Sequence, residues 1–128
     1  MKQRVLVVED DPAFGELLKR WLEYEGHEAI LADTLEAGFI KIAAEPLPDV
    51  VLLDIYLGNK NGLAIVHWAR KQKHLAHIPI AAVSGSDTLR DLKRMQDAGC
   101  DSCFTKPLDF QALREFLAAL PVHVQPAR

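Results

Sequence analysis

Val50-Val51-Leu52-Leu53-Asp54 joins four consecutive apolar residues directly to a carboxylate. A short run that is apolar at every position is typical of a strand buried on both faces, because a strand with one face in water alternates apolar and polar residues. Such strands form parallel sheets that helices cover on both sides. The run therefore predicts a central strand with an acidic group at its carboxyl end.

Three other runs of strand-like residues also lead into polar side chains. Val5–Val8 precedes Glu9, Asp10 and Asp11, Ile80–Val83 precedes Ser84, and Cys103–Thr105 precedes Lys106-Pro107. The carboxyl ends of parallel strands meet at one edge of a sheet, where open α/β sheets bind their ligands. These polar groups are therefore expected to share one site. Carboxylates, a hydroxyl and a lysine together favour metal-assisted phosphoryl chemistry.

Helix signals separate these runs. Asp11-Pro12 supplies a helix cap and a proline at the first helical position, and the helix is expected to end at Gly26, before a short strand over Ala29–Ala32. Asp33, with Glu36 three residues on, predicts the start of a second helix that ends near Pro46 and Pro48.

The second half of the chain repeats the alternation. A loop over Gly58–Gly62 precedes a third helix from Leu63, Ser86-Asp87 is expected to cap a fourth, and Asp109 a fifth that ends at Pro121. Repeated strand and helix units with right-handed crossovers place helices on both faces of the sheet. We therefore predict one doubly wound three-layer α/β domain with five parallel strands and five helices.

Size and charge narrow the classes of function. The 128 residues suffice for one domain, which we place at 1–121, with 122–128 as a short tail or the start of a linker. The net charge of −3 comes from scattered Lys and Arg that Asp and Glu outnumber, which argues against direct nucleic-acid binding. No apolar run is long enough to span a bilayer and no signal-peptide pattern is visible, so we expect a cytoplasmic protein.

The two cysteines, Cys100 and Cys103, have a Cys-x-x-Cys spacing that also occurs in redox pairs and zinc sites. A zinc site needs two further ligands, and a thioredoxin-type pair opens a helix, whereas this pair leads into a strand. We interpret both as small packing residues beside the last strand.

In both spacing and residue type, the sequence resembles the receiver domain of two-component response regulators over nearly its whole length. The resemblance is carried by Glu9-Asp10, Asp54, Ser84 and Lys106-Pro107, which match the acidic pair, phosphoacceptor, hydroxyl and lysine of receivers. It implies a flavodoxin-like sheet of order 2-1-3-4-5. It also implies a cis peptide bond between Lys106 and Pro107.

Three carboxylates at one edge repel one another unless a cation neutralises them, and an all-oxygen cluster suits Mg²⁺. Asp10 and Asp54 are the expected direct ligands and Glu9 is expected to act through water, while the resemblance adds the backbone carbonyl of Tyr56. Asp54 is the expected nucleophile, with charge on the phosphoryl oxygens stabilised by the metal and Lys106. For Asp11, helix capping is the preferred interpretation.

Ser84 is expected to bind the new phosphoryl group and draw its loop inward, which is the usual receiver switch. Receivers usually have an aromatic residue where this chain has Cys103, and often a Met-Pro pair where it has Leu57-Gly58, so we expect a different output signal and a looser loop. Tyr56 and Ser86 occupy the positions that tune autodephosphorylation in this family. A bulky Tyr56 is expected to shield the acyl phosphate.

The sequence thus predicts a non-enzymatic signalling domain that accepts phosphate on Asp54 from a histidine kinase or a histidine phosphotransfer protein and contacts a downstream protein target. Three alternatives remain: a phosphate-independent interaction domain with a receiver fold, a receiver excised from a larger regulator or hybrid kinase, and a small metal-dependent phosphohydrolase. The last would need a second acid or base, which Tyr56 does not provide. A homodimer through the fourth and fifth helices is also possible.

Overall fold

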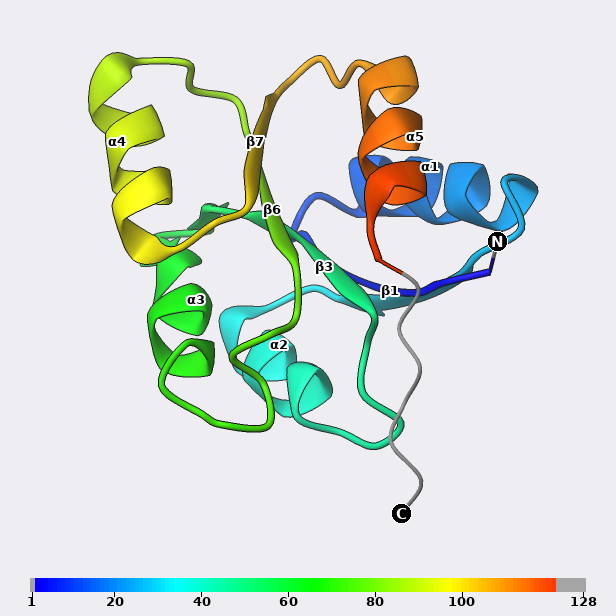
Figure 1. Ribbon diagram of the computed structural model, residues 1–128. Coiled ribbons are helices and arrows are strands. Elements are labelled where there is room, and N and C mark those ends of the chain that lie inside the picture. Colours follow the sequence, from blue (N-terminus) through cyan, green and yellow to red (C-terminus); the bar gives the residue numbers. More distant parts are fainter. Residues whose placement is uncertain (1, 122–128) are drawn as a thin grey trace.

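The computed structural model describes residues 2–121 and places a five-stranded parallel sheet between two layers of helices (Figure 1). In spatial order, the strands are β2 (Glu28–Ala32), β1 (Arg4–Val8), β3 (Val50–Asp54), β6 (Ile80–Ser84) and β7 (Ser102–Thr105). All four neighbouring pairs are parallel. The predicted order 2-1-3-4-5 is confirmed, and the assigned tail at 122–128 lies outside the described residues.

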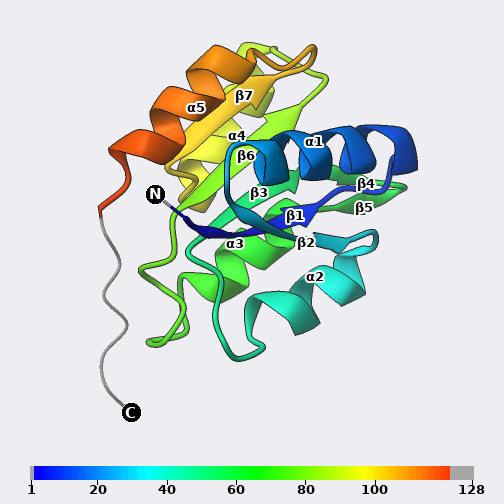
Figure 2. The same cartoon turned by 90° about the vertical axis from the view of Figure 1, so that its right-hand side faces the viewer.

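Helices cover both faces of the sheet, as the wholly apolar strands predicted. Figures 1 and 2 show α1 (Pro12–Tyr24) and α5 (Phe110–Ala119) on one side, with α2 (Leu35–Ile42), α3 (Leu63–Ala69) and α4 (Leu89–Ala98) on the other.

Successive residues of one strand enter different cores. Val5 and Val7 of β1 belong to the core under α1 and α5, whereas Leu6 and Val8 belong to the core under α2, α3 and α4. Each fully buried side chain of this kind contributes roughly 1.5–3 kcal/mol. The two cores therefore fix the positions of the strand ends that carry the polar groups.

The helix starts confirm two predicted caps and correct two others. Asp11 and Asp109 cap α1 and α5, each accepting hydrogen bonds from backbone N–H groups of the first turn. The cap of α2 is Thr34 rather than Asp33, and the cap of α4 is Thr88 rather than Ser86-Asp87. In each case, the threonine stands in extended backbone directly before the helix, so its hydroxyl reaches the first free N–H groups. Helix α2 also ends earlier than predicted, at Ile42.

The segment predicted as a plain loop after the third strand contains a short hairpin. Residues Tyr56–Leu57 (β4) pair antiparallel with Lys60–Asn61 (β5) around Gly58, whose φ of 64° lies in the left-handed region. A two-residue hairpin turn favours glycine at such a position. The prediction of a loop was wrong because the glycine and asparagine content was interpreted without the pairing that this turn permits.

The cysteines have the packing role that was predicted for them. Cys100 and Cys103 are half-buried and free, and both pack against the core under α2, α3 and α4. Burial raises the pKa of the Cys100 thiol to about 12, so this thiol is protonated at neutral pH. Both cysteines therefore serve the packing beside β7.

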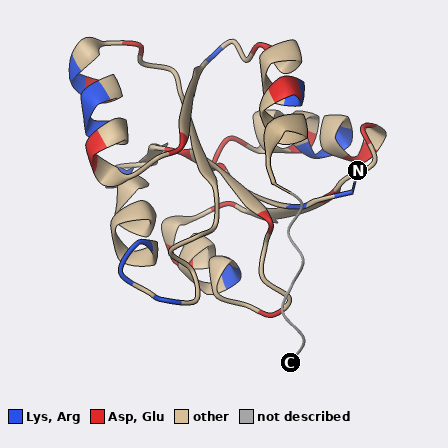
Figure 3. Cartoon of the chain, viewed as in Figure 1, with Lys and Arg blue, Asp and Glu red and all other residues tan. Residues whose placement is uncertain are grey.

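Charged residues are spread over several elements within the described part of the chain, with basic and acidic groups intermixed on α4 and α5 (Figure 3). Among residues 2–121, no helix has both the length and the apolar character needed to cross a lipid bilayer.

Gly62 lets the chain pass directly beside the end of β3. Its N–H donates to the carbonyl of Ile55 at 2.7 Å, and a Cβ added at Gly62 would lie 2.2 Å from the carbonyl oxygen of Asp54. Neither backbone can give way without moving the end of the central strand. Glycine at this position therefore fixes where the Asp54 side chain begins.

The Gly62→Ala substitution should lower the free energy of unfolding by about 1–3 kcal/mol, because the added methyl overlaps backbone rather than a flexible side chain. Urea denaturation measures the effect. Gly15→Ala in α1 is the matched control, since its added Cβ would meet its nearest neighbour at 3.8 Å. That variant should be more stable by about 0.5–1 kcal/mol through helix propensity. Equal stability of Gly62→Ala and the wild type would contradict the close approach.

Candidate functional site

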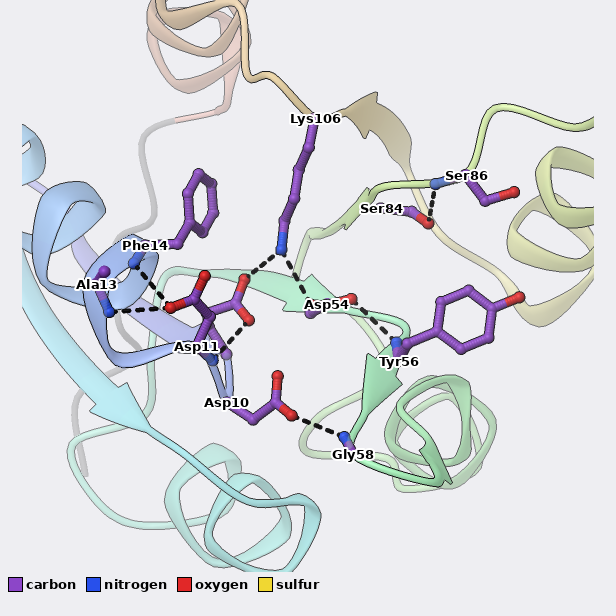
Figure 4. A network of polar contacts seen from close by, with 11 residues as sticks. Asp10, Asp11, Ala13, Phe14, Asp54, Tyr56, Gly58, Ser84, Ser86 and Lys106 are labelled. Atoms are coloured by element: carbon purple, nitrogen blue, oxygen red, sulfur yellow. Dashed lines mark hydrogen bonds and ion pairs between the residues drawn. The ribbon is translucent and has the colours of Figure 1, made fainter.

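The ammonium group of Lys106 joins the ends of three strands. It donates to Glu9 Oε1 at 2.7 Å and to Asp54 Oδ2 at 3.1 Å, although these residues are 97 and 52 positions away in the chain (Figure 4). It also lies 4.5 Å from the centroid of the Phe14 ring, within range of a cation–π interaction. The strand ends thus bring together three of the predicted site residues.

Burial and ion pairing act in opposite directions on this group of charges. Burial raises the pKa of Glu9 above its ordinary value, and the hydrogen bond from Lys106 offsets only part of that effect. For Lys106, burial acts to lower the pKa, but the hydrogen bonds with Glu9 and Asp54 outweigh it and the pKa rises. Lys106 is therefore a stable cation at neutral pH. Ionisation of Glu9 is less favourable than that of an exposed glutamate.

Asp10 completes an acidic group at the same edge. One carboxylate oxygen from each of Glu9, Asp10 and Asp54 lies within 4.8 Å of the others. Asp10 is exposed, and its Oδ2 accepts a hydrogen bond from the N–H of Gly58 at 2.7 Å. Lys106 can neutralise only one of three carboxylates, so the group fits a small divalent cation with oxygen ligands.

The Asp54 carboxylate is buried and oriented by the residue two positions further on. It is 7% exposed, and its Oδ1 accepts from the N–H of Tyr56 at 2.9 Å. The Tyr56 ring points away from Asp54 toward α4 (Figure 4), and its hydroxyl donates to Asp91 Oδ2 at 2.9 Å. The carboxylate therefore has one oxygen on Lys106 and one on a backbone N–H.

Ser84 lies at the end of β6 and is fully buried. Its hydroxyl oxygen is directed toward Ser86 and accepts from that residue's N–H at 3.0 Å (Figure 4). The N–H of Lys106 donates to the carbonyl of Ser84 at 2.8 Å, which joins the ends of β6 and β7. The Lys106–Pro107 peptide is cis.

Two neighbours of the site had no clear signal in the sequence. Neither Phe14 of α1 nor Asp91 of α4 belongs to a sequence motif that marks a site. Asp91 is 7% exposed in α4 and binds Tyr56 from 35 residues away. No spacing rule reports such a pair, because it depends on the direction of the Tyr56 side chain.

Cys103 and Phe104 face opposite sides of β7. Cys103 packs with the core under α2, α3 and α4, whereas Phe104 packs with the core under α1 and α5 and meets the Phe116 ring edge to face. The aromatic ring of β7 is thus fixed against α5, and a small thiol faces α4.

Comparisons with known proteins agree with this arrangement. Residues 5–118 match the family model described as the response regulator receiver domain. The polar-differentiation response regulator DivK of Brucella ovis is 33% identical over 109 residues, which span 84% of this chain and 87% of DivK.

Two solved structures share the fold over nearly the whole chain. A CheY-like response regulator receiver domain protein from Methanospirillum hungatei is 30% identical with a TM-score of 0.82, and the match covers 92% of each chain. The signal receiver domain of a signal transduction histidine kinase from Syntrophus aciditrophicus is 25% identical with a TM-score of 0.85, covering 98% of this chain and 95% of that one. With the carboxylates, serine and lysine gathered at one sheet edge, these matches show that the chain belongs to the family of response regulator receiver domains.

Proposed function

We propose that Asp54 accepts a phosphoryl group from a phosphohistidine of a histidine kinase or a histidine phosphotransfer protein. One observation carries the proposal: a buried carboxylate shares the Lys106 ammonium with Glu9 and lies beside a third carboxylate, Asp10. An aspartate that only forms a surface ion pair needs neither burial nor two neighbouring carboxylates. A site for transferring a dianionic phosphoryl group needs both a nucleophile and fixed positive charge.

In the proposed reaction, a carboxylate oxygen of Asp54 attacks phosphorus and the bond from phosphorus to the histidine nitrogen breaks. The product is an acyl phosphate, and the histidine retains the electron pair of the broken bond. Lys106, already 3.1 Å from Asp54 Oδ2, stabilises the charge on the phosphoryl oxygens. The N–H of Tyr56 holds the other carboxylate oxygen in place.

Glu9, Asp10 and Asp54, with the backbone carbonyl of Tyr56, are the residues that would hold Mg²⁺. The donor set consists only of oxygens, and its negative charge exceeds what Lys106 neutralises. When bound, such a cation supplies charge stabilisation to the phosphoryl oxygens. Its presence would also relieve the unfavourable ionisation of Glu9.

Ser84 is the proposed sensor of the phosphoryl group. Its oxygen accepts from Ser86 N–H, so the hydroxyl hydrogen is available to bind a phosphoryl oxygen without losing that bond. The resulting shift of the loop between β6 and α4 changes the surface offered to a downstream protein target. Cys103 is too small to add the ring movement that an aromatic residue would provide, so the loop and α4 carry the signal.

Incubation with acetyl phosphate and Mg²⁺ should add one phosphoryl group to the wild type, measured by intact mass. Asp54→Asn should add none, because an amide oxygen is a poor nucleophile and forms no acyl phosphate. Leaving out Mg²⁺ should abolish or strongly slow the reaction of the wild type.

Asp11→Asn is the matched control for this experiment. Asparagine caps a helix about as well as aspartate, and Asp11 caps α1 through its Oδ1, so this variant should be phosphorylated like the wild type. A wild type that folds but gains no phosphoryl group would instead support the phosphate-independent interaction domain.

The burial of Glu9 in the proposed cation site also predicts that the stability of the fold depends on pH. The pKa of Glu9 in the folded protein lies above its ordinary value of 4.5, chiefly through burial. A raised pKa stabilises the fold at low pH, and this contribution is lost as the pH rises through the folded value. In metal-free buffer, the melting temperature of Glu9→Gln should therefore gain on that of the wild type as the pH rises above 4.5.

Glu36→Gln provides the opposite sign as a control. The hydrogen bond with Lys60 lowers the pKa of Glu36, so the wild type should gain on this variant as the pH rises toward 4.5. Added Mg²⁺ should raise the melting temperature of the wild type more than that of Glu9→Gln. A difference in melting temperature between the wild type and Glu9→Gln that stays constant from pH 4 to 7 would refute the raised pKa of Glu9.

A further inference from the structure

Asp91 in α4 is a buried carboxylate that lies outside the acidic group of Glu9, Asp10 and Asp54. The residue is 7% exposed, and its Oδ2 accepts from the hydroxyl of Tyr56 at 2.9 Å. Its Oδ1 accepts from Arg94 at 3.1 Å, and its backbone N–H donates to Thr88 Oγ1, which lies 3.4 Å from Ser86 Oγ. Asp91 thus joins α4 to the segments that follow β3 and β6.

Tyr56 and Ser86 have equivalent places relative to the site. Each follows a site residue by two positions, and each donates its backbone N–H to that residue's side chain. The distances are 2.9 Å from Tyr56 N to Asp54 Oδ1 and 3.0 Å from Ser86 N to Ser84 Oγ (Figure 4). The Asp54 carboxylate is therefore held by a residue whose side chain binds Asp91, and the Ser84 hydroxyl by a residue whose side chain meets Thr88, the cap of α4.

We propose that Asp91 is a positioning residue for the phosphorylation of Asp54. From α4, it fixes Tyr56, whose N–H in turn orients the Asp54 carboxylate. The proposal rests on the proposed function, because it concerns the rate at which Asp54 takes up a phosphoryl group.

The Tyr56 side chain depends on this hydrogen bond for its direction. It is 47% exposed, so packing alone does not determine where the ring lies. The bond to Asp91 draws the ring toward α4 and leaves the Asp54 side of the site open for a phosphodonor (Figure 4). Shielding of the acyl phosphate by Tyr56, as the sequence predicted, would require this bond to break.

Asp91 is suited to hold Tyr56 at neutral pH. The hydroxyls of Ser86 and Tyr56 lower the pKa of Asp91, and Arg94 acts in the same direction. The carboxylate is therefore ionised, and it offers stronger acceptor oxygens than a neutral group would. Because Asp91 belongs to α4, any change in the position of α4 also reaches Asp54 through Tyr56, and the coupling acts in both directions.

The test measures the rate of phosphorylation by acetyl phosphate in the presence of Mg²⁺. In this reaction, a carboxylate oxygen of Asp54 attacks phosphorus, and acetate leaves with the electron pair of the broken oxygen–phosphorus bond. Asp91→Ala and Tyr56→Phe should each slow the reaction by about fivefold, which corresponds to one ordinary hydrogen bond. The double variant should be no slower than Asp91→Ala, because both changes remove the same link.

Conservative and matched variants separate positioning from general stability. Asp91→Asn should recover most of the rate, since its amide oxygen still accepts from Tyr56 while its pairing with Arg94 is lost. Asp97→Ala removes an exposed carboxylate of α4, and Tyr24→Phe removes the hydroxyl of an exposed tyrosine. Both controls should react at the wild-type rate. Additive losses in the double variant, or an Asp91→Ala protein as fast as the wild type, would overturn the proposal.

A second readout does not depend on phosphorylation. In amide NMR spectra, Asp91→Ala should shift the Asp54 and Tyr56 resonances, whereas Asp97→Ala should leave them in place. If the wild type takes up no phosphate, the proposed function fails, and these resonances still decide whether Asp91 holds Tyr56. If Asp91→Ala does not fold, Tyr56→Phe removes the same hydrogen bond and must show the same slow reaction and the same shifts.

Discussion

The ion pairs of Lys106 with Glu9 and Asp54 are the interaction on which the arrangement of the site depends. Three carboxylates at the end of a buried sheet would repel one another, and burial alone already disfavours the ionised form of Glu9. Lys106 extends from the end of β7 across to β1 and β3, so its contacts require all three strands to be in register. The backbone supports the same alignment, because the Lys106 N–H binds the carbonyl of Ser84 and Gly62 lets the chain pass against the Asp54 carbonyl. The compensation is incomplete, so the three carboxylates keep a negative charge that a divalent cation could neutralise.

Cys103 and Tyr56 lie on the α4 side of the site, whereas Gly58 lies beside Asp10. Gly58 replaces a residue that is often proline, and its N–H, which proline lacks, binds Asp10 from the β4–β5 hairpin. Cys103 replaces an aromatic residue and faces the core under α4. Tyr56 extends to Asp91 in that same helix. A hydrogen bond from Tyr56 to α4 thus exists where the rotating ring of β7 is missing, and through the Tyr56 N–H it connects α4 to Asp54.

Patterns that depend on one strand or one helix start could be predicted from the sequence. The wholly apolar runs, the polar residues after them and the Asp11 and Asp109 caps followed from local chemistry, and the strand order followed from the family resemblance. The errors arose where neighbouring residues had similar chemistry or where the partner was distant. Asp33 and Thr34 are both good caps, and only the backbone conformation selects Thr34. The hairpin at Gly58 depends on a left-handed φ. Asp91 acquires Tyr56 as a partner only when α4 and the segment after β3 are brought together, so no local pattern indicated its role.

A crystal structure with beryllium fluoride and Mg²⁺ would test most directly that these residues form one phosphoryl-accepting site. The account predicts beryllium fluoride bound to a carboxylate oxygen of Asp54, with Lys106 Nζ and the Ser84 hydroxyl in contact with its fluorine atoms and a cation at Asp10 and Asp54. Ser84 Oγ should still accept from the Ser86 N–H, and Asp91 should still bind the Tyr56 hydroxyl. Beryllium fluoride absent from Asp54 under saturating conditions, with Lys106 still paired to Glu9 and Asp54 as in the unligated protein, would contradict the account.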